Sequence, residues 1–437
     1  MLYSLPQIML VFTITLLPLM AAVFFGFPLP AAVLPGLALL LWMETRRGVK
    51  HRTLLHVVQT GLSRNRTIAW LLVFIGLMLP TWAAAGITED LNLLFQHTLR
   101  PDFFFTSAFL ITGAMSFAVG SAVGSLSIVG IPLMSAGLAL ALPAPVLAGA
   151  LVSGAFVGDR TSPLSSSFQL MRFAVETSTS AHFRQIMPTL VLSGLITTAV
   201  YAAADAYFYT GAAAPSPSPL DPAAAAGSLA APLLLLLLIA AGRSMYTCFL
   251  SGIAAGALLL IWRGVSTEVW LTYMLFGRDT LQGLLDMLPF VLFILLVGAF
   301  CQLIESSGML QPLLSRFFPH NVSFTSASWR TVAAAGMISL LSPNQSFPIL
   351  LTGRALQEWW HTHFHRRHLG RLLADSTVVF AGMVPWSLLA VLCAAIVGVP
   401  VIYYVPAAVF LWLTPFVTVA YSWLLARWTA ARTNAAD

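Results

Sequence analysis

Residues 153–168 read SGAFVGDRTSPLSSSF, a polar stretch inside an otherwise apolar part of the chain. Pro163 cannot continue an unbroken helical hydrogen-bond ladder, and Gly158 permits a turn beside it. Asp159 adds a negative charge next to a run of hydroxyl side chains. Lipid cannot satisfy backbone groups freed by a helix break, so such a break persists only where protein or a wet cavity surrounds it. The stretch therefore predicts a broken membrane helix that carries a binding site.

The composition of the whole chain is that of a membrane protein. Of its 437 residues, 59% are hydrophobic and 8% are charged, whereas about 25% are charged in ordinary soluble domains. Apolar runs of the roughly 17 to 25 residues that cross a bilayer recur from residue 7 to residue 423. The sequence predicts one all-α polytopic membrane protein, surrounded by the lipid bilayer. The net charge of +6 comes from residues in short loops that set orientation, so we expect no nucleic-acid partner.

No cofactor or resident metal is expected. The three cysteines lie in separate apolar runs without a second Cys or His at ligand spacing, so we interpret them as small core hydrophobes. Lys50 is the only lysine and no Walker A sequence surrounds it, which excludes a P-loop ATPase. We find no motif of an intramembrane enzyme either. We therefore expect a transporter, not an enzyme, and a retained first helix at 7–25 because that run lacks a cleavage site.

The chain contains a faint internal repeat, of the kind from which many transporter folds are built. GLMLPTWAAAG at 76–86 and GAFCQLIESSG at 298–308 end a span with the same separation of their glycines. Each is followed by a polar cluster and then by an aspartate. These landmarks are GSAVGS at 120–125 with Asp159, and SPNQS at 342–346 with Asp375.

Each half divides in the same way into two closely spaced helices, a helix after a charged loop, an apolar pair with a polar tip, a helix broken at an aspartate, and a last helix. The expected segments are 7–25, 28–43, 68–86, 103–142, 144–180 (break 158–165) and 186–208, then 229–241, 244–262, 281–304, 326–358, 372–396 (break 375–386) and 399–424. The predicted units are a first transmembrane repeat at 1–208, a linker rich in Pro, Ala and Ser at 209–228, and a second repeat at 229–437.

Reading each apolar pair as a re-entrant hairpin gives about five transmembrane helices per half and makes the second repeat inverted. With both termini in the cytoplasm, fifteen of the 21 Lys and Arg residues lie on the cytoplasmic side. Arg100, Arg263 and Arg278 lie on the other side, and three more lie in or beside the membrane segments. This asymmetry follows the positive-inside rule. We therefore expect ten crossing helices and two hairpins in an inner-membrane protein. The fifteen are Arg46, Arg47, Lys50, Arg52, Arg64, Arg66, Arg172, Arg184, Arg243, Arg316, Arg366, Arg367, Arg371, Arg427 and Arg432.

Three acids are the proton-coupling candidates. Asp159 lies at a break within apolar sequence, where an ionisable group is costly and usually functional; the alternatives are a pair with Arg160 or a cap on the next half-helix. Asp375 begins the matching element, and its alternative role is an N-cap at the cytoplasmic interface. Glu305 closes an apolar helix and is equally explained as an interfacial carboxylate.

Hydroxyl and amide side chains near these acids complete the predicted site, because a partly dehydrated cation needs oxygen ligands. Close helix packing is the alternative explanation for the glycines and serines of the tips. The run HTHFHRRH at 361–368 has the composition of a metal site, but it falls in a predicted cytoplasmic loop, so we expect a solvated charge patch. The predicted ion- or substrate-binding residues are Asp159, Thr161, Ser162, Ser165, Asp375, Thr377, Ser121, Ser125, Asn344 and Gln345.

At these stretches the sequence resembles the NhaC-type sodium/proton antiporters of the ion transporter superfamily. The family pattern Gly-Asp-Lys-x-Ser-Pro-Leu-Ser-Asp is similar to GDRTSPLSS at 158–166, and its Leu-Glu-Asp followed by Val-Pro-Trp is similar to LLADSTVVFAGMVPW at 372–386. Looser similarity extends over most of the chain. The resemblance implies the inverted-repeat fold and an ion site that includes Asp159, Ser162, Ser165 and Asp375.

The chain departs from that family pattern at two acids. Ser166 stands where the family usually has an acid, and Pro343-Asn344-Gln345 stands where it usually has Gly-Asp-Gln. Loss of two anionic ligands would weaken sodium binding and free the site for another substrate. The class of transporter is therefore better determined by the sequence than the transported ion.

The first functional hypothesis is a secondary active transporter that exchanges a cation, such as Na+, for protons by alternating access. The second keeps the fold and exchanges a small organic anion or amino acid against Na+ or H+, with Arg160, Arg172 or Arg354 as the carboxylate partner. A channel is a further alternative, since pores also use broken helices. The sequence leaves open the substrate, the stoichiometry and the oligomeric state, a homodimer included.

Overall fold

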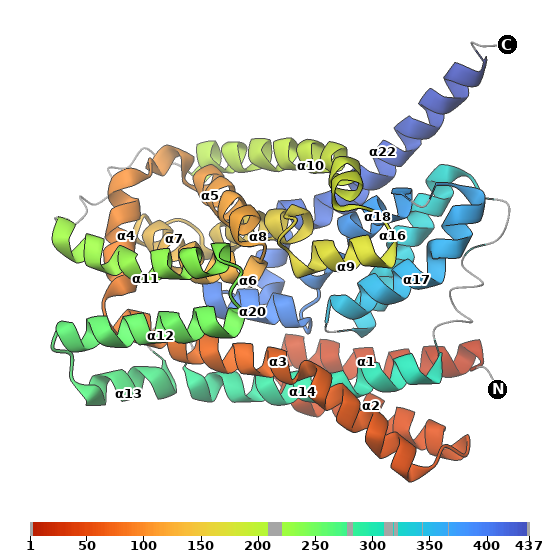
Figure 1. Ribbon diagram of the computed structural model, residues 1–437, viewed down its shortest axis with the longest axis horizontal. Coiled ribbons are helices and arrows are strands. Elements are labelled where there is room, and N and C mark those ends of the chain that lie inside the picture. The colour runs from red at the N-terminus through yellow and green to blue at the C-terminus, as the bar shows by residue number, and fades with distance from the viewer. Residues whose placement is uncertain are drawn as a thin grey trace.

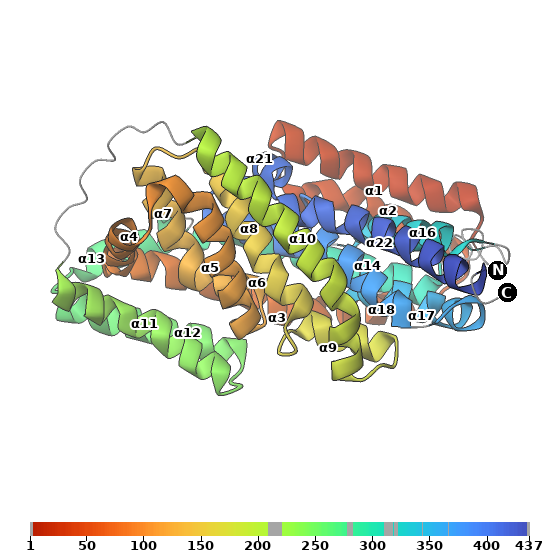
Figure 2. The same ribbon diagram turned by 90° about the horizontal axis from the view of Figure 1, so that it is seen from above.

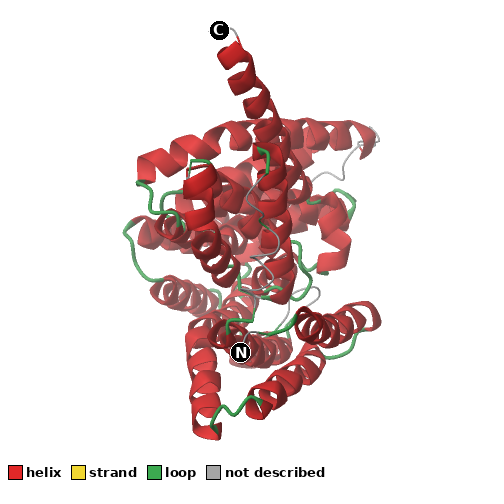
Figure 3. Cartoon of the chain, turned by 90° about the vertical axis from the view of Figure 1, so that its right-hand side faces the viewer, coloured by secondary structure: helices red, strands yellow, loops and turns green. Residues whose placement is uncertain are grey.

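The computed structural model describes residues 3–208, 221–277, 283–309, 318, 322–342, 344–365 and 367–434. Within these residues the chain consists of helices and loops, without a strand (Figure 3). The helices up to the predicted linker are α1 (Leu5–Phe25), α2 (Leu29–Arg46), α3 (His51–Ala84), α4 (Ile87–Thr98), α5 (Phe104–Val119), α6 (Ala122–Ser125), α7 (Ile131–Ala139), α8 (Ala144–Thr161), α9 (Ser166–Ala174) and α10 (Thr179–Phe208). The later helices are α11 (Pro222–Ala240), α12 (Met245–Trp262), α13 (Thr267–Phe276), α14 (Leu284–Ser307), α16 (Phe324–Leu341), α17 (Ser346–His363), α18 (Arg367–Leu373), α19 (Val379–Ala381), α20 (Leu388–Val397), α21 (Val401–Tyr404) and α22 (Val409–Asn434).

Nine helices in the described part of the chain are long and apolar enough to cross a membrane, or ten if one bent pair counts as a span. That pair is Leu388–Val397 with Val401–Ala407, which meet at 85°. The prediction of an all-α polytopic membrane protein is therefore confirmed. The inverted orientation of the two halves and the two re-entrant hairpins remain predictions.

The helices form two layers in Figure 1. In the lower layer α3 runs along α14 and α12 (Figure 1), and α2 contacts both α1 and α14. In the upper layer α8 lies against α5, and α22 lies along α10 and α16. The broken helices α8–α9 and α18–α20 both belong to this upper layer. Figure 2 shows that the two termini lie toward the same end of the molecule.

Several element boundaries differ from the predicted ones. α3 begins at His51, inside the predicted charged loop. α4 and α13 lie where no helix was predicted, because Glu89, Asp90 and Glu268 interrupt their apolar patterns. The predicted last helix at 399–424 is divided at residues 398–408, so that α22 starts ten residues later than expected.

The predicted break at 375–386 is also shorter in the structure. Residues 374–378 form a π-helical turn that continues the helix, and the chain unwinds only after Ala381. Asp375 therefore lies inside a helix, and neither begins the segment nor caps it. A π-turn of this kind commonly marks a functional position within a helix.

Part of the predicted linker is helical. Asp221 accepts a hydrogen bond from the Ala223 backbone amide at 2.9 Å and caps α11, so residues 222–228 form its first turns. Residues 209–220 lie outside the described residues. The same holds for four other residues used in the sequence analysis, which are Arg278, Arg316, Pro343 and Arg366.

Candidate functional site

Asp159 lies in the last turn of α8, directly before the break at residues 162–165. The Ser165 hydroxyl donates to the main-chain oxygen of Asp159 at 2.6 Å and lies 3.3 Å from Oδ1 of its carboxylate. The Ser167 hydroxyl lies 3.3 Å from Oδ2. Ser165 also caps α9, accepting from the Ser167 backbone amide at 3.1 Å. The serines after Pro163 thus hold the broken segment against the carboxylate of Asp159, a residue that is 4% exposed.

Two glycines let the first predicted hairpin lie against this break. A Cβ at Gly158 would stand 2.0 Å from the carbonyl carbon of Ser116, so α8 reaches the backbone of α5 only because no side chain intervenes. Gly120 has a φ of 71° between α5 and α6, and a Cβ there would lie 2.7 Å from the carbonyl carbon of Leu164. The prediction that Gly158 permits a turn is wrong, since Gly158 is helical. Its role in the structure is close approach.

The tip of the second predicted hairpin reaches the same carboxylate. The Gln345 side-chain amide donates to the Ser167 hydroxyl at 2.5 Å and also interacts with the Asp159 carboxylate. The backbone amide of Ala122, at the first tip, interacts with the carboxylate as well. Groups from three separate segments therefore converge on Asp159. Of the predicted residues, the structure brings together Asp159, Ser165 and Gln345.

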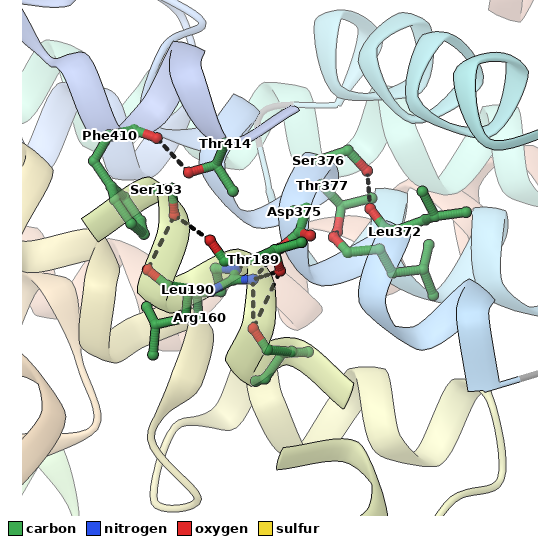
Figure 4. A network of polar contacts seen from close by, with 12 residues as sticks. Arg160, Thr189, Leu190, Ser193, Leu372, Asp375, Ser376, Thr377, Phe410 and Thr414 are labelled. Carbon is green, nitrogen blue, oxygen red and sulfur yellow. Dashed lines mark hydrogen bonds and ion pairs between the residues drawn. The ribbon is translucent and has the colours of Figure 1, made fainter. Parts of the chain in front are cut away.

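Asp375 has a different environment, because it pairs with Arg160 (Figure 4). Both side chains are fully buried. Nε of Arg160 lies 2.7 Å from Oδ1 of Asp375, and Nη2 contacts the same oxygen. Nη2 also donates to the Thr189 hydroxyl at 2.8 Å and to the Ile186 carbonyl at 3.3 Å. Arg160 therefore compensates Asp375, and the alternative pair between Arg160 and Asp159 does not form.

Three other predicted residues make local contacts at the hairpin tips. Ser121 accepts from the Gly124 backbone amide at 3.2 Å, and the Ser125 hydroxyl donates to the Ala122 carbonyl at 2.9 Å. Oδ1 of Asn344 accepts from the Ser346 amide at 3.0 Å. These contacts are those of caps and turns, and they shape the tips that carry Ala122 and Gln345.

The remaining predicted hydroxyls differ in how well they are satisfied. Ser162 accepts from the Leu164 amide at 3.3 Å, and the Thr377 hydroxyl donates to the Leu373 carbonyl at 2.7 Å. The Thr161 hydroxyl is buried without a hydrogen-bond partner, as is Oε1 of Gln345. Gln345 belongs to the Asp159 environment, where its Oε1 can serve as a further cation ligand. Thr161 follows Asp159 by two residues on α8, and residues at that spacing do not face each other.

Glu305 lies at the end of α14, where it pairs with Arg64 at 2.8 Å. The two side chains are 42% and 50% exposed, which fits the interfacial carboxylate that the sequence left as an alternative. A cavity of about 30 Å³ is lined by Glu305 together with Asn344. For the run at 361–368, no group of three or more metal-ligating side chains is found within the described residues.

Sequence reasoning left two features out of the predicted site. Ser167 belongs to the serine run that follows Pro163. Its position two residues after Ser165, the N-cap of α9, could have signalled that its side chain faces the Asp159 carboxylate. Arg160 was considered as a partner of its neighbour Asp159 or of a substrate. Its actual partner is 215 residues away, and the available signal was that Arg160 and Asp375 are opposite charges that both lie within predicted membrane segments.

Comparison with known proteins supports a shared architecture. A model of the Na+/H+ antiporter family matches residues 49–205 and 222–424. The chain is 26% identical over 425 residues to the malate-2H+/Na+-lactate antiporter of Bacillus subtilis (strain 168), covering 90% of this chain and 88% of the relative. It is 25% identical over 387 residues to the Na+/H+ antiporter NhaC of Alkalihalophilus pseudofirmus, covering 83% of each. It is 26% identical over 365 residues to the arginine/ornithine antiporter ArcD of Halobacterium salinarum, covering 77% of this chain and 74% of the relative.

Proposed function

Because this chain belongs to the Na+/H+ antiporter family, we propose that it exchanges a small cation for protons and that Asp159 is the carboxylate that binds both. The observation that carries this proposal is that the Asp159 carboxylate is buried among neutral groups, without an ion pair within the described residues. The residue is 4% exposed, and within the described residues no cationic side chain forms an ion pair with its carboxylate. A buried carboxylate without a cationic partner is costly. A bound cation or a bound proton removes that cost.

The two ligands would compete for one group, and exchange follows from that competition. A carboxylate that holds a proton has lost the negative charge that attracts the cation, and a bound cation displaces the proton. Serine and glutamine side chains around Asp159 supply neutral oxygens for either state. Since Asp375 is compensated by Arg160, a single unpaired carboxylate serves the site, and we propose one proton exchanged for each monovalent cation.

The ion pair with Arg160 gives Asp375 a supporting role in this proposal. It ties the last turn of α8 to the π-turn that contains Asp375, across the two halves of the chain. The tip residue Gln345 ties the second half to α9 through Ser167. Movements of the second half would therefore be transmitted to the groups around Asp159, as alternating access at a site between repeats requires. We place this multi-pass protein in the inner membrane with cytoplasmic termini, following the charge asymmetry.

The proposal is tested by transport in proteoliposomes that contain the purified protein and a trapped pH-sensitive dye. Pulses of Na+, Li+ or K+ at stepped pH are expected to cause saturable proton efflux with at least one of them. Asp159→Asn should abolish the response while the protein stays folded and inserted, because the amide keeps the size but loses the charge and the titratable group. Asp102→Asn makes the same chemical change at the surface pair with Arg100 and should leave transport intact. Transport by Asp159→Asn at the wild-type rate would reduce Asp159 to a structural cap.

A second candidate function is the exchange of organic ions on the same fold. Relatives named for malate and lactate, and for arginine and ornithine, align with most of this chain. Of the three arginines considered from the sequence, Arg160 is paired, Arg172 donates to Gln169 at 3.0 Å, and Arg354 is exposed. The observation that favours an organic anion is instead a fourth arginine, Arg371, which is 2% exposed and whose Nε and Nη1 are buried without a hydrogen-bond partner.

A further inference from the structure

A cavity of about 640 Å³ lies between the first turns of α1 and the last turns of α2. Its volume is within the range of ordinary ligand pockets. None of the residues around Asp159 lines it. The cavity thus combines two guanidinium groups and one amide with an apolar wall. The polar residues of its lining are Gln7, Arg46 and Arg47, and the others are Tyr3, Leu10, Trp42 and Met43.

Arg47 is fixed at this cavity by Tyr3 and Glu44. Its Cζ lies 4.0 Å from the centre of the Tyr3 ring, and its Nη1 lies 3.2 Å from Oε1 of Glu44. The Tyr3 hydroxyl donates to the same carboxylate oxygen. Burial raises the pKa of Tyr3 to about 12, so this hydroxyl keeps its proton. Arg47 is therefore preorganised, and Glu44 balances its charge.

Arg46 supplies a positive charge that no acid matches. It is exposed, and its Cζ lies 5.3 Å from the centre of the Trp42 ring. It forms no ion pair within the described residues. Helix α1 carries no acidic residue, and residues 44–52 contain four positive charges and one negative charge. The cavity is therefore suited to one anionic group.

The apolar side of the cavity continues along both helices. Leu10 and Leu17 are exposed on α1, and Trp42 and Leu34 are exposed on α2. Residues seven or eight apart belong to one stripe of a helix. Helix α1 is long and apolar enough to cross a membrane, and it lies at the edge of the molecule in Figure 2. These stripes therefore offer acyl chains a surface that begins at the two arginines.

We propose that this cavity binds a phospholipid with a net negative headgroup, with the phosphodiester at Arg46 and Arg47 and an acyl chain along Leu10. Guanidinium groups donate strong hydrogen bonds to phosphate oxygens, and basic pockets between membrane helices are typical sites for anionic headgroups. The Gln7 side-chain oxygen accepts from the Ser4 backbone amide at 3.0 Å, which leaves its NH2 group as a further donor.

The two ends of the cavity together define the class of ligand. A zwitterionic headgroup would bring its own cation beside Arg46, which disfavours it. Free phosphate has no acyl chain and would leave the apolar wall without a partner. The inference concerns the contact between the protein and its lipids, and it goes beyond the proposed transport function.

Lipid binding to the purified full-length protein, measured by native mass spectrometry, tests this site. The delipidated protein is titrated in detergent with phosphatidylglycerol and phosphatidylcholine that carry the same acyl chains. The wild type should bind its first phosphatidylglycerol about tenfold more tightly than phosphatidylcholine, the factor expected from one charge-assisted hydrogen bond. Arg46→Glu should abolish this preference, and Arg46→Gln should reduce it. Because Arg46 is exposed and forms no ion pair within the described residues, both variants should fold.

Arg427→Gln is the matched control. Arg427 is also exposed, and its Cζ lies 4.0 Å from the centre of the Trp423 ring, but it does not line the cavity. This variant should keep the wild-type preference. Equal binding of the two lipids by the wild type, an unchanged preference in Arg46→Glu, or the same loss in Arg427→Gln would overturn the proposal. Displacement of phosphatidylglycerol by an equal concentration of inorganic phosphate would also overturn it, because the site would then recognise phosphate alone.

Discussion

Removal of one member of the Arg160–Asp375 pair should cost much more stability than removal of both. Both side chains are 0% exposed, so neither remaining charge can be solvated by water. Arg160→Met leaves a buried carboxylate, and Asp375→Leu leaves a buried guanidinium. Each single change should lower the free energy of unfolding by about 3–5 kcal/mol, whereas apolar replacement of both members of such pairs is often neutral or stabilising.

The prediction is measured as a double-mutant cycle, using reversible unfolding of the purified protein in mixed micelles. The matched control is Arg64→Met with Glu305→Leu, since that pair is half-exposed and should contribute no more than about 1 kcal/mol. We expect the double variant of the buried pair to be more stable than either single variant. Costs that simply add, or single costs as small as those of the control, would refute the pairing and restore Asp375 as a free cation ligand.

Three further predictions concern the site and the topology. Apparent cation affinity should fall about tenfold for each pH unit on the acidic side of the site's titration when one proton competes at Asp159. An affinity that stays flat from about pH 9 down to about pH 4, the ordinary pKa of an aspartate, would place the coupling proton elsewhere. Gly158→Ala should lower the free energy of unfolding by about 1–3 kcal/mol or more through overpacking and impair transport, whereas Gly194→Ala, with nothing within 4 Å of the added Cβ, should not. Cysteines placed at Thr267 and His363 should be labelled only from outside and only from inside, respectively, and outside labelling at 363 would contradict the inverted-hairpin topology.

The sequence alone determined the class of fold because membrane insertion depends on local composition. Long apolar runs require helices, since lipid offers the backbone no hydrogen-bond partners. The break after Asp159 was also predictable, because Pro163 forbids a regular helix there and the serines that follow cap the next helix. In contrast, α4 and α13 were missed because they are short and carry acids, so they do not have the pattern of a membrane span.

Only the tertiary structure decided which acid is free and which is paired. Asp159 and Arg160 are neighbours in sequence, but successive residues on a helix point about 100° apart. One therefore faces the serines and Gln345, while the other reaches Asp375 on a helix 215 residues later. Spacing along the chain carries no information about such a contact, because it depends on how α8 packs against the π-turn of the second half. For the same reason, the contact between Gln345 and Ser167 could be recognised only after α17 was placed against α9.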